Sequence, residues 1–402
     1  DFFIEQKKIR IESGVISRKE REIPLRRIQN VDIKRNIIHR ILEIAEVKLE
    51  TAGGETTEAS LRYVGEEQAK DIQKKIRELK RGAEREESTE SPEEFETIYE
   101  IEDKELLLLG ITSSGLGAIL GAFVMMGIFG SIIGSAFEQV GVGLVAGLIA
   151  IGLLGIGISW IISTFKNMMK FYGFKLVQKD DSLEYERGLL NRSEGSIPLE
   201  KIQKLTIEEN VLKRLIGYST LKIETAGYSA SSSMEGPESA IPLAERSRIL
   251  DVVNRIEGTG EISIQGLPKR ARTRYFSRYM ILSVILTGMT GLLELTLSSL
   301  SFITGAVFVT LGVVSAVGAH LKWKNKGYFL GEKHAVAVNG FWKRDTMILP
   351  YYRIQNLIQY ETFFQRRWDL AGIIFDVAGT NLFQKDARIT DLDRDEAEKL
   401  RE

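Results

Sequence analysis

The chain has 402 residues, enough for two to four domains, and a formal net charge of -1. This near-neutral balance gives no sign of a nucleic-acid-binding protein, and the absence of cysteine excludes disulfides, thiolate metal sites and cysteine nucleophiles. The sequence also lacks the motifs of nucleotide-binding loops, zinc proteases and serine hydrolases, so we expect no enzyme, catalytic residue, cofactor or metal site.

Residues 1–81 show mainly the alternation that is typical of strands. FFIEQKKIRIES and VISRKEREIPL alternate apolar and polar residues around Gly14, and VKLETAG and ASLRY indicate further short strands. The segment IQNVDIKRNIIHRIL changes towards a helical spacing, and GEEQAKDIQKKIRELKR has the pattern of a helix with charged flanks. We predict an antiparallel β-sandwich or partly closed barrel of about seven strands, followed by one C-terminal helix.

The next range, 82–103, is predicted to be an acidic linker. It holds ten acidic residues and a single basic residue, Arg85. We expect this segment to be a solvated tether, because an anionic leaflet would repel its charge.

Four long apolar runs occur in two pairs. Each is as long as the roughly 20 residues that a helix needs to cross the hydrocarbon core of a membrane. Their length and near lack of charge argue against buried helices of a soluble protein. We predict two transmembrane helical hairpins, 104–166 and 279–322, built from the runs 106–136, 140–163, 279–298 and 302–321.

Lysine and arginine flank both predicted hairpins, whereas the turns inside them lack these residues. Positive charge stays on the cytoplasmic side, so we predict a multi-pass protein of the cell (cytoplasmic) membrane with its polar domains in the cytoplasm. The linker 259–278 holds nearly all of the basic run PKRARTRYFSRY (268–279), which serves either as this topology signal or as a contact with anionic lipid. Spacings such as Gly117-x-x-x-Gly121 permit close helix packing, within a hairpin or in an oligomer.

One phrase occurs three times: IPLRRIQNVDI at 23–33, IPLEKIQKLTI at 197–207 and, more loosely, LPYYRIQNLIQ at 349–359. Around each proline, a glycine lies ten residues earlier, and a glutamine, an arginine and a second glycine lie five, sixteen and twenty-nine residues later. These signature residues are Gly14, Pro24, Gln29, Arg40, Gly53, Gly188, Pro198, Gln203, Arg214, Gly227, Gly340, Pro350, Gln355, Arg366 and Gly379. The chain therefore holds three copies of one domain, at 1–81, 171–258 and 327–402.

The phrase [IL]-P-x-x-[RK]-I-Q and the T-A-G ending resemble the second type of bacterial pleckstrin-homology (PH)-like domain, found in YdbS/YdbT-like membrane proteins. The resemblance covers nearly the whole chain, and it implies a PH-like fold for each copy on the cytoplasmic face of a membrane. Members with three copies usually have a further membrane hairpin before the first domain. This chain begins at Asp1, so we expect such a hairpin to be missing.

We interpret the signature residues as structural rather than functional, because proline ends strands and fold constraints recur in every copy. Basic residues near the membrane are the candidates for lipid contact: Arg26, Arg27, Lys34, Arg35, Arg270, Arg272 and Arg274. The sequence favours a non-enzymatic integral membrane protein that presents three cytoplasmic PH-like domains to a protein partner or to anionic lipid headgroups. The alternative is a component of membrane transport or lipid handling.

Overall fold

The computed structural model is built mainly of antiparallel sheet. Its contacts divide the chain into a first unit, residues 1–201, 216–220 and 239–246, and a second unit, residues 202–215, 221–238 and 247–402. The structure describes residues 2–4, 8–13, 19–25, 28–51, 59–84, 95–113, 142–225, 239–297, 301–378 and 387–401.

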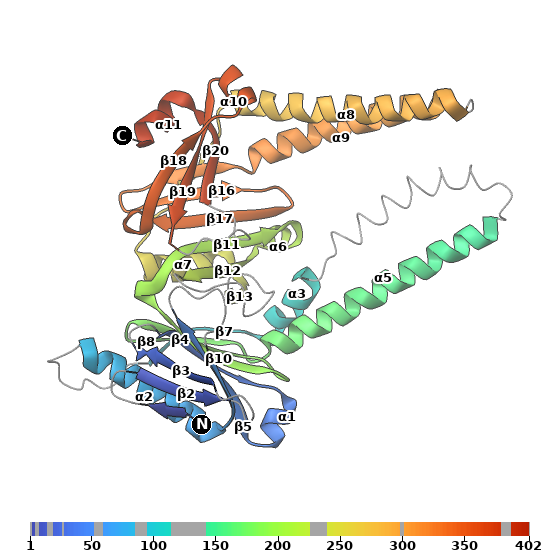
Figure 1. Ribbon diagram of the computed structural model, residues 1–402. Helices are drawn as coiled ribbons and strands as arrows, with labels where there is room; N and C mark the ends of the chain where they lie inside the picture. Colours follow the sequence, from blue (N-terminus) through green and yellow to red (C-terminus); the bar gives the residue numbers. More distant parts are fainter. Residues whose placement is uncertain are drawn as a thin grey trace. The chain divides into compact units, whose positions relative to one another are not determined.

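The first unit contains two antiparallel sheets (Figure 1). The smaller has the order β1-β2-β3, formed by Phe2–Ile4, Lys8–Ser13 and Lys19–Pro24. The larger has the order β6-β5-β4-β10-β9-β8-β7. Its strands are β4 (Ile28–Arg35), β5 (Ile44–Thr51), β6 (Ala59–Gly65), β7 (Phe95–Glu100), β8 (Lys175–Lys179), β9 (Ser182–Arg187) and β10 (Arg192–Pro198).

The larger sheet joins two copies of the repeat, because β4 of the first copy pairs with β10 of the second. Strand β7 lies inside the range 82–103, where the sequence analysis expects a solvated tether. Its Tyr99 is fully buried, and the hydroxyl donates to the main-chain oxygen of Leu243, so this part of the range is held by packing.

The helices of the first unit are α1 (Ile37–Ile41), α2 (Glu66–Glu84), α3 (Asp103–Ser113) and α5 (Val142–Phe171). Helix α2 packs on a hydrophobic core that holds residues from both sheets of the first copy, and it contributes Ala69, Ile72 and Ile76. Helix α3 packs closely on α5: a Cβ added at Gly110 would lie 2.8 Å from Cγ2 of Thr164 (Figure 1).

The second copy is completed by η2 (Leu199–Lys201), β11 (Ile202–Asn210), α6 (Val211–Ile216), β12 (Tyr218–Thr225), β13 (Ser239–Glu245) and α7 (Arg246–Glu257). In the second unit β11 pairs with β17, and the sheet continues through β16 and β15 to β14. These strands are β14 (Gln265–Gly266), β15 (Gly327–Leu330), β16 (His334–Asn339) and β17 (Lys343–Pro350).

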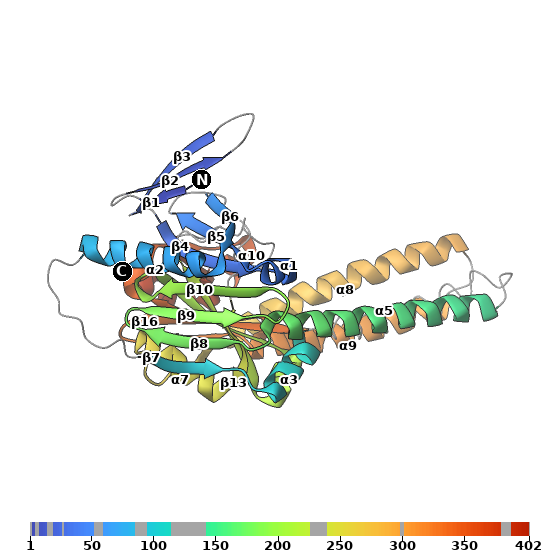
Figure 2. The ribbon, with the colours of Figure 1, turned by 90° about the horizontal axis from the view of Figure 1, so that it is seen from below.

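The third copy ends in a three-stranded sheet with the order β18-β19-β20. Helices α8 and α9 lie side by side as a pair in both views (Figures 1 and 2). These elements are α8 (Lys269–Leu297), α9 (Ser301–Lys324), η3 (Tyr351–Arg353), β18 (Ile354–Tyr360), α10 (Phe363–Arg367), β19 (Leu370–Val377), β20 (Ala387–Asp393) and α11 (Arg394–Arg401). One core combines residues of β16, β17, β19 and β20 with Ala271 and Tyr275 of α8 and Ala319 of α9.

The predicted fold class needs two corrections. Across the described residues, no helix is long and apolar enough to cross a membrane, so the two predicted transmembrane hairpins are wrong. The first turns of α8 are strongly basic and pack on the third copy, and residues 114–141 of the first apolar pair lie outside the described ranges. The copies are also not three separate sandwiches, because strands of neighbouring copies share a sheet.

Candidate functional site

The copies meet through the same pair of strands in both units. We call the pairing of β4 with β10 the first junction and that of β11 with β17 the second junction. Arg35, eleven residues after Pro24, lies opposite Arg192, six residues before Pro198. In the second junction Glu209 and Arg344 occupy these same two positions relative to Pro198 and Pro350. The two junctions therefore have an identical register.

At each junction a residue of this position forms an ion pair in which one of the two side chains is buried. In the first, the nearly buried Arg35 donates from Nη2 to Oε1 of Glu194 at 2.6 Å and also pairs with Glu66. In the second, Arg344 donates from Nε to Oε2 of Glu209 at 2.8 Å, and the Glu209 side chain is only 2% exposed. Removing one partner of such a pair leaves the other charge buried, so these contacts make the register specific.

The signature arginine binds the neighbouring copy at both junctions. Arg40 donates from Nη1 to the main-chain oxygen of Leu189 at 2.7 Å, and Arg214 donates from Nη2 to that of Phe341 at 2.8 Å. Leu189 and Phe341 each come directly after the signature glycine of the next copy. The recurring arginine and glycine thus connect successive copies.

Those glycines occupy backbone conformations that other residues rarely adopt. Gly188 has φ +101° and Gly340 has φ +102°, and a Cβ at either would collide with a main-chain oxygen three residues later, that of Asn191 or Lys343. A glycine without a side chain allows this tight hairpin turn. The turn in each case presents the carbonyl that the signature arginine binds.

The other signature residues differ in where they lie on the strands and in how exposed they are. Pro24, Pro198 and Pro350 end strands β3, β10 and β17. Gln203 is buried, whereas Gln355 is exposed. Gly14, Gly53, Gly227 and Gly379 lie outside the described residues, and nothing is described of the Gln29 side chain.

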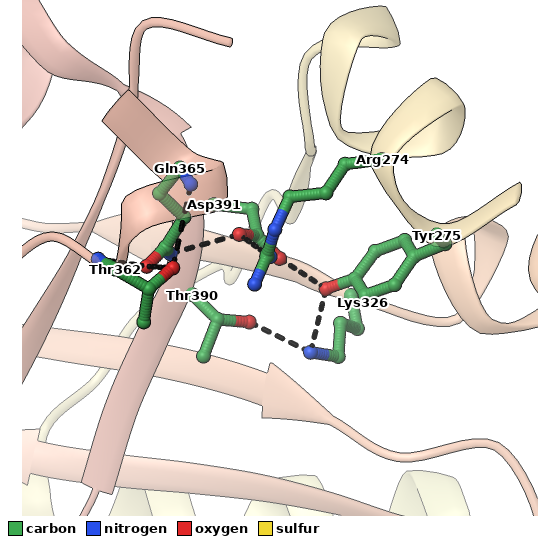
Figure 3. Close-up of polar contacts among 7 residues, drawn as sticks. All are labelled: Arg274, Tyr275, Lys326, Thr362, Gln365, Thr390 and Asp391. Carbon is green, nitrogen blue, oxygen red and sulfur yellow. Dashed lines mark hydrogen bonds and ion pairs between the residues drawn. The ribbon is translucent and has the colours of Figure 1, made fainter. Parts of the chain in front are cut away.

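A buried polar cluster joins helices α8 and α9 to the third copy (Figure 3). Asp391 on β20 is 1% exposed and accepts hydrogen bonds from Gln365 Nε2 at 2.9 Å, from the Tyr275 hydroxyl and from Arg274. Lys326, just after α9, donates to the Tyr275 hydroxyl at 2.9 Å and to Thr390 Oγ1 at 2.7 Å. We call these residues, with Thr362, the Asp391 cluster.

Local sequence explains how α10 supplies Gln365. Thr362 and Gln365 form a reciprocal capping box, in which each side chain binds the main-chain N–H of the other residue. The cap fixes the start of α10 and directs the Gln365 amide towards Asp391. A helix of five residues thereby has a defined orientation on the sheet.

Burial changes the proton affinities of this cluster. It lowers the pKa of the Lys326 ammonium to about 8, with the nearby Asp391 carboxylate opposing the shift. Burial also raises the pKa of the Tyr275 hydroxyl, and the Asp391 charge raises it further. The neutral hydroxyl of Tyr275 is therefore retained as a donor to the carboxylate. The cluster is suited to fixing the helix pair on the third copy rather than to transferring protons.

The candidates for lipid contact are not gathered in one place. Arg35 and Arg274 form ion pairs with acidic side chains, while Lys34 is half-buried. Arg270 and Arg272 are exposed at the start of α8, and Arg26 and Arg27 lie outside the described residues. Arg35 and Arg274 thus contribute chiefly to internal ion pairs in this conformation.

An aromatic and basic surface is formed where α8 begins beside α10. Arg270 Nη1 lies 3.6 Å from Oδ2 of Asp369, two residues after the end of α10, which brings the two helices together. Phe363 and Phe364 are 69% and 58% exposed. We define the α10 patch as the exposed residues Arg270, Arg272, Phe363, Phe364, Arg366 and Arg367.

The comparisons with known proteins agree with this repeated architecture. The sequence profile of the bacterial PH domain family matches residues 1–80, 116–265 and 281–402. The chain belongs to this family. It is also similar to the UPF0699 transmembrane protein YdbT of Bacillus subtilis (strain 168), with 27% identity over 403 residues, which cover 94% of this chain and 79% of that protein. No solved structure matches. The resemblance drawn from the repeat is confirmed.

Several residues that organise the PH domains were absent from the sequence-based candidates. Asp391, Tyr275 and Lys326 come together only in the fold, and no spacing in the sequence relates them. The pattern Thr362-x-x-Gln365 was a usable signal, because it is the motif of a capping box. The fold adds Arg270 and Arg272 of α8 to the α10 patch, although they lie about ninety positions before its other residues.

Proposed function

We propose that this protein is a non-enzymatic, membrane-associated interaction protein whose PH domains contact anionic lipid headgroups. The observation that carries the proposal is the α10 patch, which combines exposed aromatic and basic side chains on the third PH domain. Aromatic rings and arginines are both favoured at the boundary between lipid and water, where the ring and the aliphatic stem enter the apolar layer.

The helix pair next to the patch supports membrane association. Helices α8 and α9 expose many large apolar side chains, a surface that marks binding to membrane or protein rather than to water. These side chains are Ile281, Leu282, Val284, Ile285, Leu286, Met289, Leu292, Phe308, Val309, Val313, Val314 and Val317. A relative is named a transmembrane protein, which points in the same direction.

Electrostatics would orient the third PH domain. A basic residue near an anionic leaflet contributes about 1 kcal/mol, so the four arginines of the patch would add several kcal/mol at low salt. Burial of Phe363 and Phe364 adds an apolar contribution that salt does not weaken. The domain would therefore sit with α10 against the lipid, and the remaining surfaces would be available to protein partners.

The proposal can be tested by labelling a single cysteine, because the chain contains none. The full chain carrying Phe364→Cys is reconstituted in vesicles of phosphatidylcholine alone or with phosphatidylglycerol, and its reaction rate with a water-soluble maleimide is measured. We expect slower labelling in the anionic vesicles. Recovery should follow in about 1 M salt, where the Debye length is about 3 Å.

Two controls make the test specific. Trp342→Cys, at a side chain 69% exposed on another part of the same unit, should label equally in both vesicles. Replacing Arg270, Arg272 and Arg367 by glutamine in the Phe364→Cys chain should abolish the effect of lipid charge. Equal labelling of Phe364→Cys in neutral and anionic vesicles would refute headgroup contact at the patch.

A further inference from the structure

Strand β18 of the third PH domain is an open edge. It occupies the position that β4 and β11 occupy in the first two copies, but in the part of the chain that the structure describes it pairs only with β19. Its sequence, IQNLIQY, has no charge and no proline. Proteins usually protect exposed strand edges with charged residues or proline, so an edge without them is suited to pairing with another strand.

The exposure of β18 differs from that of its counterparts. Ile358, eight residues after Pro350, is 48% exposed. The residues at this position in the first and second copies, Asp32 and Thr206, are 1% and 6% exposed. In those copies the paired strand of the next copy lies alongside. Ile358 is therefore an exposed apolar side chain on β18 that a partner strand would cover.

The signature arginine of the third copy also lacks its usual partner. Arg40 and Arg214 bind a main-chain oxygen in the turn of the following copy. Arg366 is exposed, and within the described ranges its guanidinium has no hydrogen-bond acceptor. Two separate parts of the junction, the strand and the arginine, are thus present and unmatched on the third PH domain.

The matching half of a junction lies on the first PH domain. Strand β3 is the counterpart of β10 and β17, which are the partner strands of the two junctions, and it is an edge of the sheet β1-β2-β3 (Figure 2). Along this strand Glu20, Arg21 and Glu22 are exposed, and its counterparts β10 and β17 also carry charged residues and proline although they pair in the junctions. Among the strands that the structure describes, one copy of each half is therefore left unmatched.

We propose that β18 of one chain pairs antiparallel with β3 of a second chain, which forms a head-to-tail contact equivalent to the two internal junctions. The second junction gives the register: Thr206, eight residues after Pro198, lies opposite Met347, which is three residues before Pro350. The same offsets place Ile358 opposite Arg21 of the partner chain.

Such a contact uses different surfaces on the two chains. A heterologous contact of this kind leaves one free half at each end, so it builds a closed ring or an open filament rather than a two-fold dimer. The inference goes beyond the lipid contact proposed above, with which it shares Arg366, because it rests on the continuity of a junction that already occurs twice in the chain.

Oxidative cross-linking of single cysteines tests the register. Residues directly opposite on antiparallel strands have Cβ atoms about 4.5–5.5 Å apart, within reach of a disulfide after small movements. Full chains bearing Arg21→Cys are mixed with differently tagged chains bearing Ile358→Cys and oxidised. We expect a mixed species of about twice the 45.2 kDa chain mass, reversible by reductant.

A matched control uses the same strand. Gln355→Cys is also exposed on β18 but lies three residues, about 10 Å, from Ile358 along the strand, so it should cross-link at least tenfold less with Arg21→Cys. Equal yields from the two positions would overturn the proposal. So would a disulfide that forms only within single chains of the Arg21→Cys/Ile358→Cys double variant.

A second variant tests the contact without cysteine. Ile358→Lys places a charge on the edge, the device by which natural strands prevent pairing, and should raise the dissociation constant for self-association at least tenfold by light scattering of the full chain in detergent. Leu215→Lys adds the same charge at a side chain 77% exposed on α6 and should leave it unchanged. A monomeric parent chain, or equal constants for both variants, would refute the head-to-tail contact.

Discussion

Replacement of Asp391 by alanine should locally destabilise the third PH domain. The carboxylate is 1% exposed and accepts from Arg274, Tyr275 and Gln365. Its loss leaves the Arg274 charge, 16% exposed, and a buried tyrosine hydroxyl without their acceptor. Breaking a buried ion pair costs about 3–5 kcal/mol, and the partial access of water to Arg274 places the expected loss near the lower limit, about 3 kcal/mol.

Asp369 supplies a matched control on the same domain. It also has a positive φ, 51° against 66° for Asp391, and it also pairs with an arginine of α8. Its side chain is 72% exposed, however, so the loss of this surface pair should cost no more than about 1 kcal/mol. Because alanine has a similar backbone strain at both positions, the difference between the two variants measures the buried contacts.

Hydrogen exchange of the β20 and α10 amides in the full chain is the appropriate assay, because it measures local opening in a protein with several domains. A loss of about 3 kcal/mol lowers protection in Asp391→Ala by about a hundredfold, whereas Asp369→Ala should change it by less than about fivefold. If the two variants were equally protected, Asp391 would not hold α8 on the domain, and the reasoning from burial would be refuted.

Three further predictions concern pH and the junctions. The pKa of Lys326 is about 8 in the folded protein against 10.5 in the unfolded chain, so between these pH values unfolding binds a proton. The free energy of unfolding should therefore rise as the pH increases from 8 to 10.5. Lys326→Met should flatten this rise when unfolding by denaturant is measured across the same pH range. Gly340→Ala should lower the free energy of unfolding by more than the roughly 1 kcal/mol expected for Gly217→Ala. Both glycines have positive φ, but only a Cβ at Gly340 would meet a main-chain atom. Equal shifts of the melting temperature in the two variants would contradict this prediction. Arg344→Met should lower the free energy of unfolding by about 3 kcal/mol, because it removes an ion-pair partner from the buried Glu209, and the double variant with Glu209→Leu should recover part of this loss in a double-mutant cycle.

The repeat was predictable because it lies in local sequence. Alternation around Gly188 and Gly340 predicts hairpins, and both glycines have the positive φ of a tight turn. Pro198 and Pro350 end strands because proline cannot donate a main-chain hydrogen bond. The prediction of membrane hairpins was wrong for the described residues, because apolar runs in the sequence do not show where a helix begins or which of its charges pack on a domain.

The sequence alone determined that three related domains follow one another, since each proline, glycine and hydrophobic alternation acts on the chain within a few residues. It did not reveal that β4 pairs with β10 and β11 with β17, because strand pairing is a long-range choice between equally suitable edges. The tertiary structure also brought Asp391, Tyr275 and Lys326 together, and burial there gave Lys326 its lowered pKa. Local sequence preferences determined the three domains, and long-range strand pairing and burial decided how these domains are joined.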